Sequence, residues 1–388
     1  MNEKQLHQIF ENYINCFEEF NSEDKKKPSE YYKWEMPGPF KDCMNLLINA
    51  NKKEDVVSQL GAIKRITHDF IDSGKTLPLA GLTKYAVEYG EWETIQEMFQ
   101  KLYASDDLDS QKKIEVFLKQ CRELEKKHGL GGTYKSDYRS VTAYLFLYNP
   151  DNNYIYKPTH AQDFQDCIEF YEDFGEGDTI NLNTYYKMCD ELVEEIRNYP
   201  RLRELDDIRS ALIKKDNKEA YKDTKLHILA YDIIYCCSSY NLFKGISFER
   251  LTPKERKVRW EKQQKVLELL EKLKKAQEQK KTLDAAMEKV EEYFRVGQKV
   301  TYKSFGKGAQ VACGTIVRRG NDSATIDFGN SNTKTVGLIA SFVNGYIRPQ
   351  NAEESEFEDS AEVLKKKSTI EGNLSQAERE FAPYSDYI

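Results

Sequence analysis

The stretch "YKSFGKGAQVACGTIVRRGNDSATIDFGN", residues 302–330, decides the fold class, because it interrupts a chain whose pattern is otherwise largely helical. Its short runs of β-branched and aromatic residues are separated by Gly and Asn, which is typical of strands joined by turns. With the flanking runs, five such strands are expected within residues 295–350. We expect them to form a small closed β-barrel, because closure removes the exposed edges of a sheet this small.

Residues 295–350 form a basic segment, whereas the chain around it is acidic. It contains eight basic residues and two acidic ones, a net charge of +6, in a protein of 388 residues with a net charge of -7. A cationic surface on a rigid β-module predicts a negatively charged partner, either nucleic acid (DNA or RNA) or an acidic protein surface. The candidate ligand-binding residues lie in or beside predicted turns and are Tyr302, Lys303, Phe305, Lys307, Arg318, Arg319 and Arg348.

Two interpretations of these residues remain open. Exposed rings beside lysines suit a phosphate backbone with a stacked base. Alternatively, Phe305 fills the core of the barrel and the lysines are simply solvated. The pattern favours the core for Phe305 alone and binding for the basic cluster.

The first 250 residues are expected to form two domains. Residues 1–130 carry helical periodicity, as in "LHQIFENYINCFEEF", and "HGLGG" ends it. In residues 131–250 two β-rich runs, 141–148 and 154–157, flank the turn sequence "NPDNN" and predict a β-hairpin. Helical patterns follow, so this region is expected to be an α+β domain.

The second run of that hairpin supplies secondary binding candidates. Tyr154 and Tyr156 alternate with Ile155 and would share one face of a strand, with Lys157 beside them. That face is either a stacking platform or part of the core, and the core is the favoured alternative.

Residues 251–294 predict one long amphipathic helix. Thr252, Pro253 and Glu255 form a helix-start signal with a capping box. A heptad rhythm of apolar residues follows, with Lys280 as its polar interruption. The helix is either one strand of a coiled-coil dimer through residues 253–294 or, as we favour, a strut packed on the helical body. Residues 351–388 are expected to be a flexible acidic tail. The helical body and the β-module together predict an α+β multidomain protein.

Several classes of protein are disfavoured by missing motifs. The eight cysteines show no CxxC spacing, and "DSGKT" (72–76) lacks the first glycine of a phosphate loop, so we expect neither metal nor cofactor. HExxH and GxSxG are absent, and the sequence predicts no catalytic residues. No run of about 20 apolar residues and no signal-peptide pattern occur, which predicts a cytoplasmic protein without membrane contact.

The basic segment resembles the small Tudor-like, SH3-like module at the C-terminus of some superfamily 1 DNA-repair helicases. "AQVACG" after Gly308 departs from that pattern as an insertion. The resemblance implies contacts with RNA polymerase or nucleic-acid machinery. The matching positions are Gly297, Val300, Lys303, Phe305, Gly306, Gly308, Thr315, Val317, Asp327 and Phe328.

Residues 30–245 resemble the region that precedes the motor in some McrBC-type restriction GTPases. That region is expected to recognise DNA or a partner, but this chain has no Walker motif, so the resemblance implies a recognition region without a motor. The matching positions are Tyr144, Leu145, Phe146, Asn149, Pro150, Asp151, Tyr154, Ile155, Tyr156 and Lys157, and later Asp232, Ile233 and Ile234.

Together these features predict a non-enzymatic recognition protein of a prokaryotic nucleic-acid or antiviral defence system, which binds through the basic β-module. Two alternatives remain. One is a nuclease-like enzyme with an unrecognised site in the middle domain, for which Asp137, Asp151 and Asp232 are the candidate carboxylates. The other is an adaptor that binds only protein.

Overall fold

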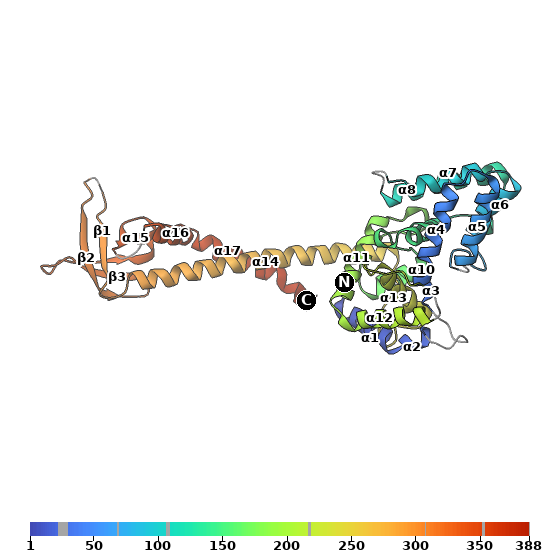
Figure 1. Ribbon diagram of the computed structural model, residues 1–388. Helices are drawn as coiled ribbons and strands as arrows, with labels where there is room; N and C mark the ends of the chain where they lie inside the picture. The colour runs from blue at the N-terminus through green and yellow to red at the C-terminus, as the bar shows by residue number, and fades with distance from the viewer. Residues whose placement is uncertain are drawn as a thin grey trace. The chain divides into compact units, whose positions relative to one another are not determined.

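The structure is a computed structural model that describes residues 1–21, 30–67, 70–105, 109–215, 219–306, 308–350 and 354–387. By its internal contacts the chain divides into two units, Met1–Trp260 and Glu261–Ile388. Figure 1 labels many of the elements of both units, which are described separately below.

The regular elements described in the first unit are helices. Short 3-10 turns, η1 (Gly132–Tyr134), η2 (Pro150–Asn152) and η3 (Gly177–Thr179), connect some of them. The helices are α1 (Glu3–Asn15), α2 (Phe17–Phe20), α3 (Tyr32–Glu35), α4 (Pro37–Ile48), α5 (Lys53–Thr67), α6 (Pro78–Glu88), α7 (Trp92–Leu102), α8 (Ser110–His128), α9 (Tyr138–Tyr148), α10 (Pro158–Cys167), α11 (Leu182–Arg197), α12 (Pro200–Lys215) and α13 (His227–Ser239).

One aromatic-rich core runs through this unit, from Leu6 to Leu242. It crosses the domain boundary expected at residue 130. The ring of Tyr144 lies 5.4 Å from that of Phe99 and 6.0 Å from that of Phe117, so residues on both sides of the boundary pack together.

The β-hairpin expected at residues 141–157 is wrong, and the middle region is helical rather than α+β. The first β-rich run forms α9, whose start is fixed by a capping box in which Asp137 accepts from the backbone N–H of Ser140 at 2.9 Å. Almost every side chain of α9 is buried, so its sequence shows an unbroken apolar run in place of helical periodicity. Pro150 then begins η2, and residues 153–157 continue without joining a strand.

The long helix is confirmed as α14 (Pro253–Tyr293). Its capping box forms as expected, because Glu255 accepts from the backbone N–H of Thr252 at 2.8 Å and Thr252 accepts from that of Glu255 at 3.3 Å. Trp260 is the last residue of the first unit, so the capped first turns belong to that unit and the remainder to the second.

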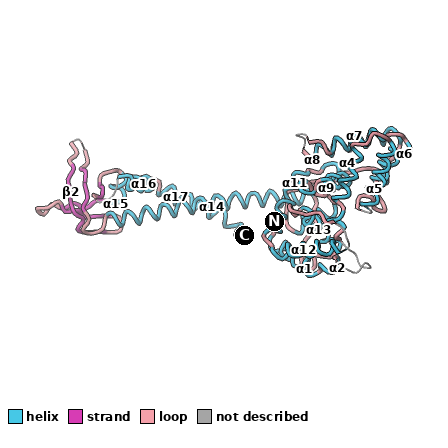
Figure 2. The backbone as a smooth tube through the Cα atoms, viewed as in Figure 1, coloured by secondary structure: helices cyan, strands magenta, loops and turns pink. Residues whose placement is uncertain are grey.

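The second unit contains a five-stranded antiparallel sheet in the order β4-β3-β2-β1-β5, coloured magenta in Figure 2. The expected closed barrel is wrong: β4 and β5 lie at opposite edges, and the pairings join neighbours only. The strands are β1 (Lys299–Lys303), β2 (Val311–Arg319), β3 (Ser323–Asp327), β4 (Thr333–Gly337) and β5 (Ile347–Pro349), with α15 (Leu338–Val343) between the last two.

One face of this sheet is covered, which explains how an open sheet of this size is stabilised without closure. Val300, Ile316 and Ile326 are fully buried on the covered face and share a core with Val290 of α14 and with Phe294, which follows that helix. Apolar burial of this kind contributes about 25 cal/mol per Å². We call the opposite side the outer face.

The expected flexible tail is also wrong, because residues 354–387 form helices α16 (Glu354–Lys365) and α17 (Lys367–Phe381) and the 3-10 turn η4 (Ala382–Tyr387). Phe357 and Leu364 join the core of the sheet, and Phe381 packs on Val266 and Leu269. In Figure 1 these C-terminal helices lie along α14. Much of the heptad stripe is therefore covered within the chain, and a dimer through residues 253–294 remains a prediction that this packing does not favour.

No helix in the described part of the chain is both long and apolar enough to cross a membrane.

Candidate functional site

The outer face of the sheet carries three cations. The register pairs Lys299 with Thr315, Lys303 with Val311 and Arg318 with Thr325, and directly paired residues project to the same side. All three cationic side chains are exposed, and none forms an ion pair with a carboxylate of the described residues. We define Lys299, Lys303 and Arg318 as the outer basic face. The hydroxyl groups of the paired residues Thr315 and Thr325 lie on the same side of the sheet.

A β-bulge places Arg318 on this face. The register shifts between Ile316 and Arg318, leaving Val317 as the extra residue. Without the bulge, Arg318 would share the covered side with Ile316, because side chains two apart on a strand point the same way. At about 3.3 Å per residue, Lys303 and Arg318 lie roughly 20 Å apart along the sheet.

The bulge also sends the neighbouring Arg319 away from the outer face. Arg319 pairs with the buried Ala324, and its guanidinium donates to the backbone carbonyls of Gly320, Asn321 and Ser323. Arg319 also lines a cavity of about 860 Å³ whose wall includes three acids of α14, Glu288, Glu291 and Glu292. Two adjacent arginines that look equivalent in the sequence therefore have different environments.

Arg348 and Tyr302 are structural rather than surface residues. The Nη1 of Arg348 donates to the carbonyl of Phe342 at 2.5 Å, and its guanidinium lies 5.1 Å from the centre of the Phe357 ring. Tyr302 is only 4% exposed and belongs to the core of the sheet. Lys307 lies outside the described residues.

Phe305 is 61% exposed, which contradicts the expectation that it fills the core. Its ring centre lies 4.0 Å from that of Tyr346, at the end of the sheet where Lys303 donates its backbone N–H to the carbonyl of Tyr346 at 2.7 Å. The Nζ of Lys334 lies 6.0 Å from the Phe305 ring centre. We call Phe305, Tyr346 and Lys334 the aromatic end.

Sequence reasoning missed Lys299, Lys334 and Tyr346. Alternation along the strand could have found Lys299, because Lys299 and Lys303 are four residues apart on one strand and must share a face. Tyr346 and Lys334 carry no such signal, since their positions depend on how the strands pair.

The secondary candidates Tyr154 and Tyr156 lie in the core of the first unit, as favoured. Both are at most 2% exposed. The hydroxyl of Tyr154 donates to Asp190 at 2.7 Å and its ring stacks on His227 with centres 4.0 Å apart, so neither tyrosine is a surface platform.

Lys157 lies within an aromatic box. Its Nζ is 4.9, 5.9 and 5.2 Å from the ring centres of Phe70, Tyr231 and Tyr235. Burial and the nearby charge of Lys33 together lower the pKa of Lys157 to about 7. Among the described residues no carboxylate forms an ion pair with it.

Beside this box lies a buried charge network. Lys33 and Asp232 are fully buried, with Nζ 2.5 Å from Oδ1, and Glu30 lies 2.9 Å from the same ammonium. Tyr13 donates to the other oxygen of Asp232 at 2.5 Å. Burial alone would lower the pKa of Lys33, but the Asp232 carboxylate raises it well above its usual value.

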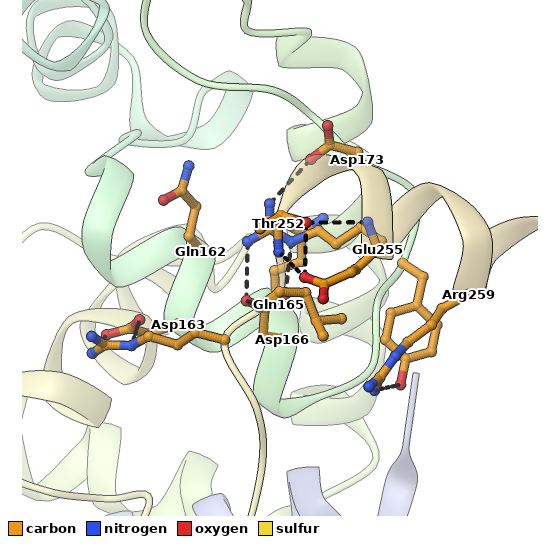
Figure 3. Close-up of polar contacts among 12 residues, drawn as sticks. Gln162, Asp163, Gln165, Asp166, Asp173, Thr252, Glu255 and Arg259 are labelled. Atoms are coloured by element: carbon orange, nitrogen blue, oxygen red, sulfur yellow. Dashed lines mark hydrogen bonds and ion pairs between the residues drawn. The ribbon is translucent and has the colours of Figure 1, made fainter.

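Another buried ion pair attaches the first turn of α14 to the first unit (Figure 3). Arg256 donates to both oxygens of Asp166, at 2.7 and 3.0 Å, and Asp166 also accepts from the backbone N–H of Leu251 at 3.0 Å. Arg250 pairs with Asp163 at 2.8 Å. Each carboxylate has its own arginine, which indicates a structural attachment.

The carboxylates considered for a nuclease have separate structural contacts. Asp137 caps α9, Asp232 belongs to the buried network, and Asp151 lies in η2. The described residues contain no group of three or more His, Cys, Asp or Glu side chains that could hold a metal ion.

Comparison with known proteins finds no matching family model, no matching curated protein and no matching solved structure. The resemblances to the helicase module and to the restriction GTPases therefore remain hypotheses.

Proposed function

We propose that this protein is a non-enzymatic recognition protein that binds nucleic acid through the outer basic face of its β-module. The observation that carries the proposal is the placement of Lys299, Lys303 and Arg318 on the uncovered side of the sheet, exposed and without an acidic partner in the described residues. Asp327 is the acid that shares this face, and its Oδ1 accepts from the backbone N–H of Gly329 at 2.8 Å.

Charge complementarity is the physical reason for choosing a polyanion. Exposed lysines and arginines release condensed counterions when they bind phosphates, and this drives association without any base contact. The flat β-face adds threonine hydroxyls, which also bond to phosphate oxygens. The resemblances imply a setting in a prokaryotic nucleic-acid or defence system, and that setting is part of the proposal.

An adaptor that binds only protein is the second candidate. The exposed apolar side chains of Val311 and Val317 beside the basic face are the observation that favours it. Such a partner would present an acidic surface, so the two candidates differ in the ligand rather than in the surface used.

The test is a comparison of two triple variants of the full chain, with fluorescence anisotropy on a labelled 12-nucleotide oligonucleotide at 0.1 M salt. Lys299→Ala/Lys303→Ala/Arg318→Ala should weaken binding roughly 100-fold, because three phosphate contacts are lost. Lys272→Ala/Lys275→Ala/Lys281→Ala removes the same charge from exposed positions of α14 and should change affinity less than about threefold.

Equal losses in both triple variants would overturn the proposal, because overall charge and not the outer face would then determine binding. No binding by the wild-type chain would also overturn it. Binding to polyglutamate, measured in parallel, would support the adaptor in its place.

A further inference from the structure

The aromatic end of the sheet has a feature that phosphate binding does not require. Phe305 exposes most of a large apolar ring to solvent and does not join the core of the sheet. One side of that ring is against Tyr346, with centres 4.0 Å apart and planes tilted by 43°, so the exposed area lies on the side away from Tyr346.

The loop that carries Phe305 is closed by its own hydrogen bonds. Ser304 donates its backbone N–H to the carbonyl of Gln310 at 3.0 Å, and its hydroxyl accepts from the backbone N–H of Gln310 at 2.9 Å. Gly306 and Gly308 have φ values of +102° and +92°, a conformation that other residues rarely adopt. These hydrogen bonds join the two ends of the loop beside Phe305.

One cation lies beside this ring, and another precedes it in the chain. The Nζ of Lys334 is 6.0 Å from the centre of the Phe305 ring, and Lys303 of the outer basic face ends the strand two residues before it. Lys334 of the edge strand β4 pairs with the buried Ile326, and its Nζ lies 4.8 Å from the centre of the Tyr302 ring, so it extends from the covered side of the sheet, whereas Lys303 belongs to the outer basic face. Because Phe305 follows Lys303 by only two residues, a nucleic-acid strand that crosses the outer basic face past Lys303 would reach the exposed ring.

We propose that the aromatic end stacks one unpaired base and makes the protein prefer single-stranded nucleic acid. This inference rests on the proposed function and adds the class of ligand. Every base has a π-face that can stack on an aromatic side chain, whereas a base within a duplex is already stacked on its neighbours. Lys303 of the outer basic face then contacts a phosphate next to the stacked base.

The experiment measures three labelled 12-nucleotide probes with the full chain: a thymidine strand, its duplex with the complementary strand, and an abasic strand of the same charge. Phe305→Ala should weaken binding of the thymidine strand between about 5-fold and 150-fold. Its affinity for the duplex and for the abasic strand should change less than twofold, because neither offers a free base. A uridine strand distinguishes DNA from RNA.

Two matched variants control for general effects. Leu267→Ala removes an exposed apolar side chain, 52% exposed, from α14 and should leave all three affinities within twofold. Phe305→Trp should retain the single-strand preference, because it keeps the ring. Binding of a strand with one 2-aminopurine should quench that base's fluorescence in the wild-type chain and not in Phe305→Ala.

The outcomes separate this inference from the proposed function. Equal losses on all probes, or no loss and no quenching difference, would overturn base stacking while leaving nucleic-acid binding intact. If the wild-type chain binds none of the probes, the proposed function itself is wrong.

Discussion

Charged side chains have opposite environments in the two units. In Met1–Trp260, charged groups such as Lys33, Asp232 and Asp166 are buried and held by partners of the same unit. In Glu261–Ile388, Lys303 and Arg318 are exposed on an uncovered sheet and have no carboxylate partner among the described residues.

This contrast separates charge that stabilises the fold from charge that is free to bind. A buried ion costs several kcal/mol in desolvation, so it persists only with good partners, and its removal destabilises the protein. An exposed cation costs little and can exchange its water for an external anion. Arg318 and Arg319 show the same contrast within one dipeptide, since the β-bulge leaves one free and satisfies the other.

Breaking the buried network should have the largest effect on stability. Asp232→Ala leaves the ammonium of Lys33 in a dry site with only Glu30, and should lower the free energy of unfolding by about 3–5 kcal/mol. Urea denaturation at pH 7 measures this loss in the free energy of unfolding. Asp207→Ala, at an exposed position of α12, is the control and should cost less than about 0.5 kcal/mol. A cost below 1 kcal/mol for Asp232→Ala would remove the distinction between the two units.

Lys157 extends the comparison, because its half-buried ammonium lies among aromatic rings and forms no ion pair with a carboxylate of the described residues. Its folded-state pKa of about 7 lies below the unfolded value of about 10.4, so the stability it contributes is present above pH 10.4 and is lost as the pH falls to 7. Lys157→Met should therefore be more stable than the wild type at pH 7, by about 1–3 kcal/mol, with the difference shrinking toward pH 10. Urea denaturation between pH 7 and 10 measures the difference.

Lys41→Met provides the control for Lys157. The ammonium of Lys41 lies 5.5 Å from the ring centre of Tyr148, but Lys41 is exposed. Its substitution should give a pH-independent difference. A difference for Lys157→Met that is constant across the same pH range would show that the ammonium is solvated in the folded protein.

The sequence predicted the elements that carry local signals. The capping box at Thr252 predicted the start of α14, and alternating β-branched residues with Gly and Asn turns predicted the strands of the second unit. The prediction from the sequence was wrong where a helix is buried on all sides. The helix α9 is apolar all round, so its run of Val, Tyr and Phe resembled a strand. The closure of the sheet was also mispredicted, because α14, α15 and α16 cover one face and make a barrel unnecessary.

The candidate site was only partly predictable for the same reason. Lys303 and Arg318 follow from composition and turn position, whereas the separation of Arg318 from Arg319 depends on a bulge that no local residue announces. The helical tail was missed because its apolar residues, Phe357, Leu364 and Ile370, are few and become buried only against the rest of the second unit. The features that the sequence failed to predict, the bulge and the helical tail, therefore depend on pairing and packing between segments that are distant in the chain.

The most direct test of the central claim, that the three cations of the outer basic face contact phosphates, is the salt dependence of binding. For a single strand the logarithm of the association constant should fall with a slope of about -2 against the logarithm of salt concentration. The dissociation constant of the wild-type chain should thus rise about 20-fold between 50 and 200 mM salt, and that of Lys299→Ala/Lys303→Ala/Arg318→Ala should rise less than about threefold. A wild-type dissociation constant that stays within twofold over this range would contradict the account.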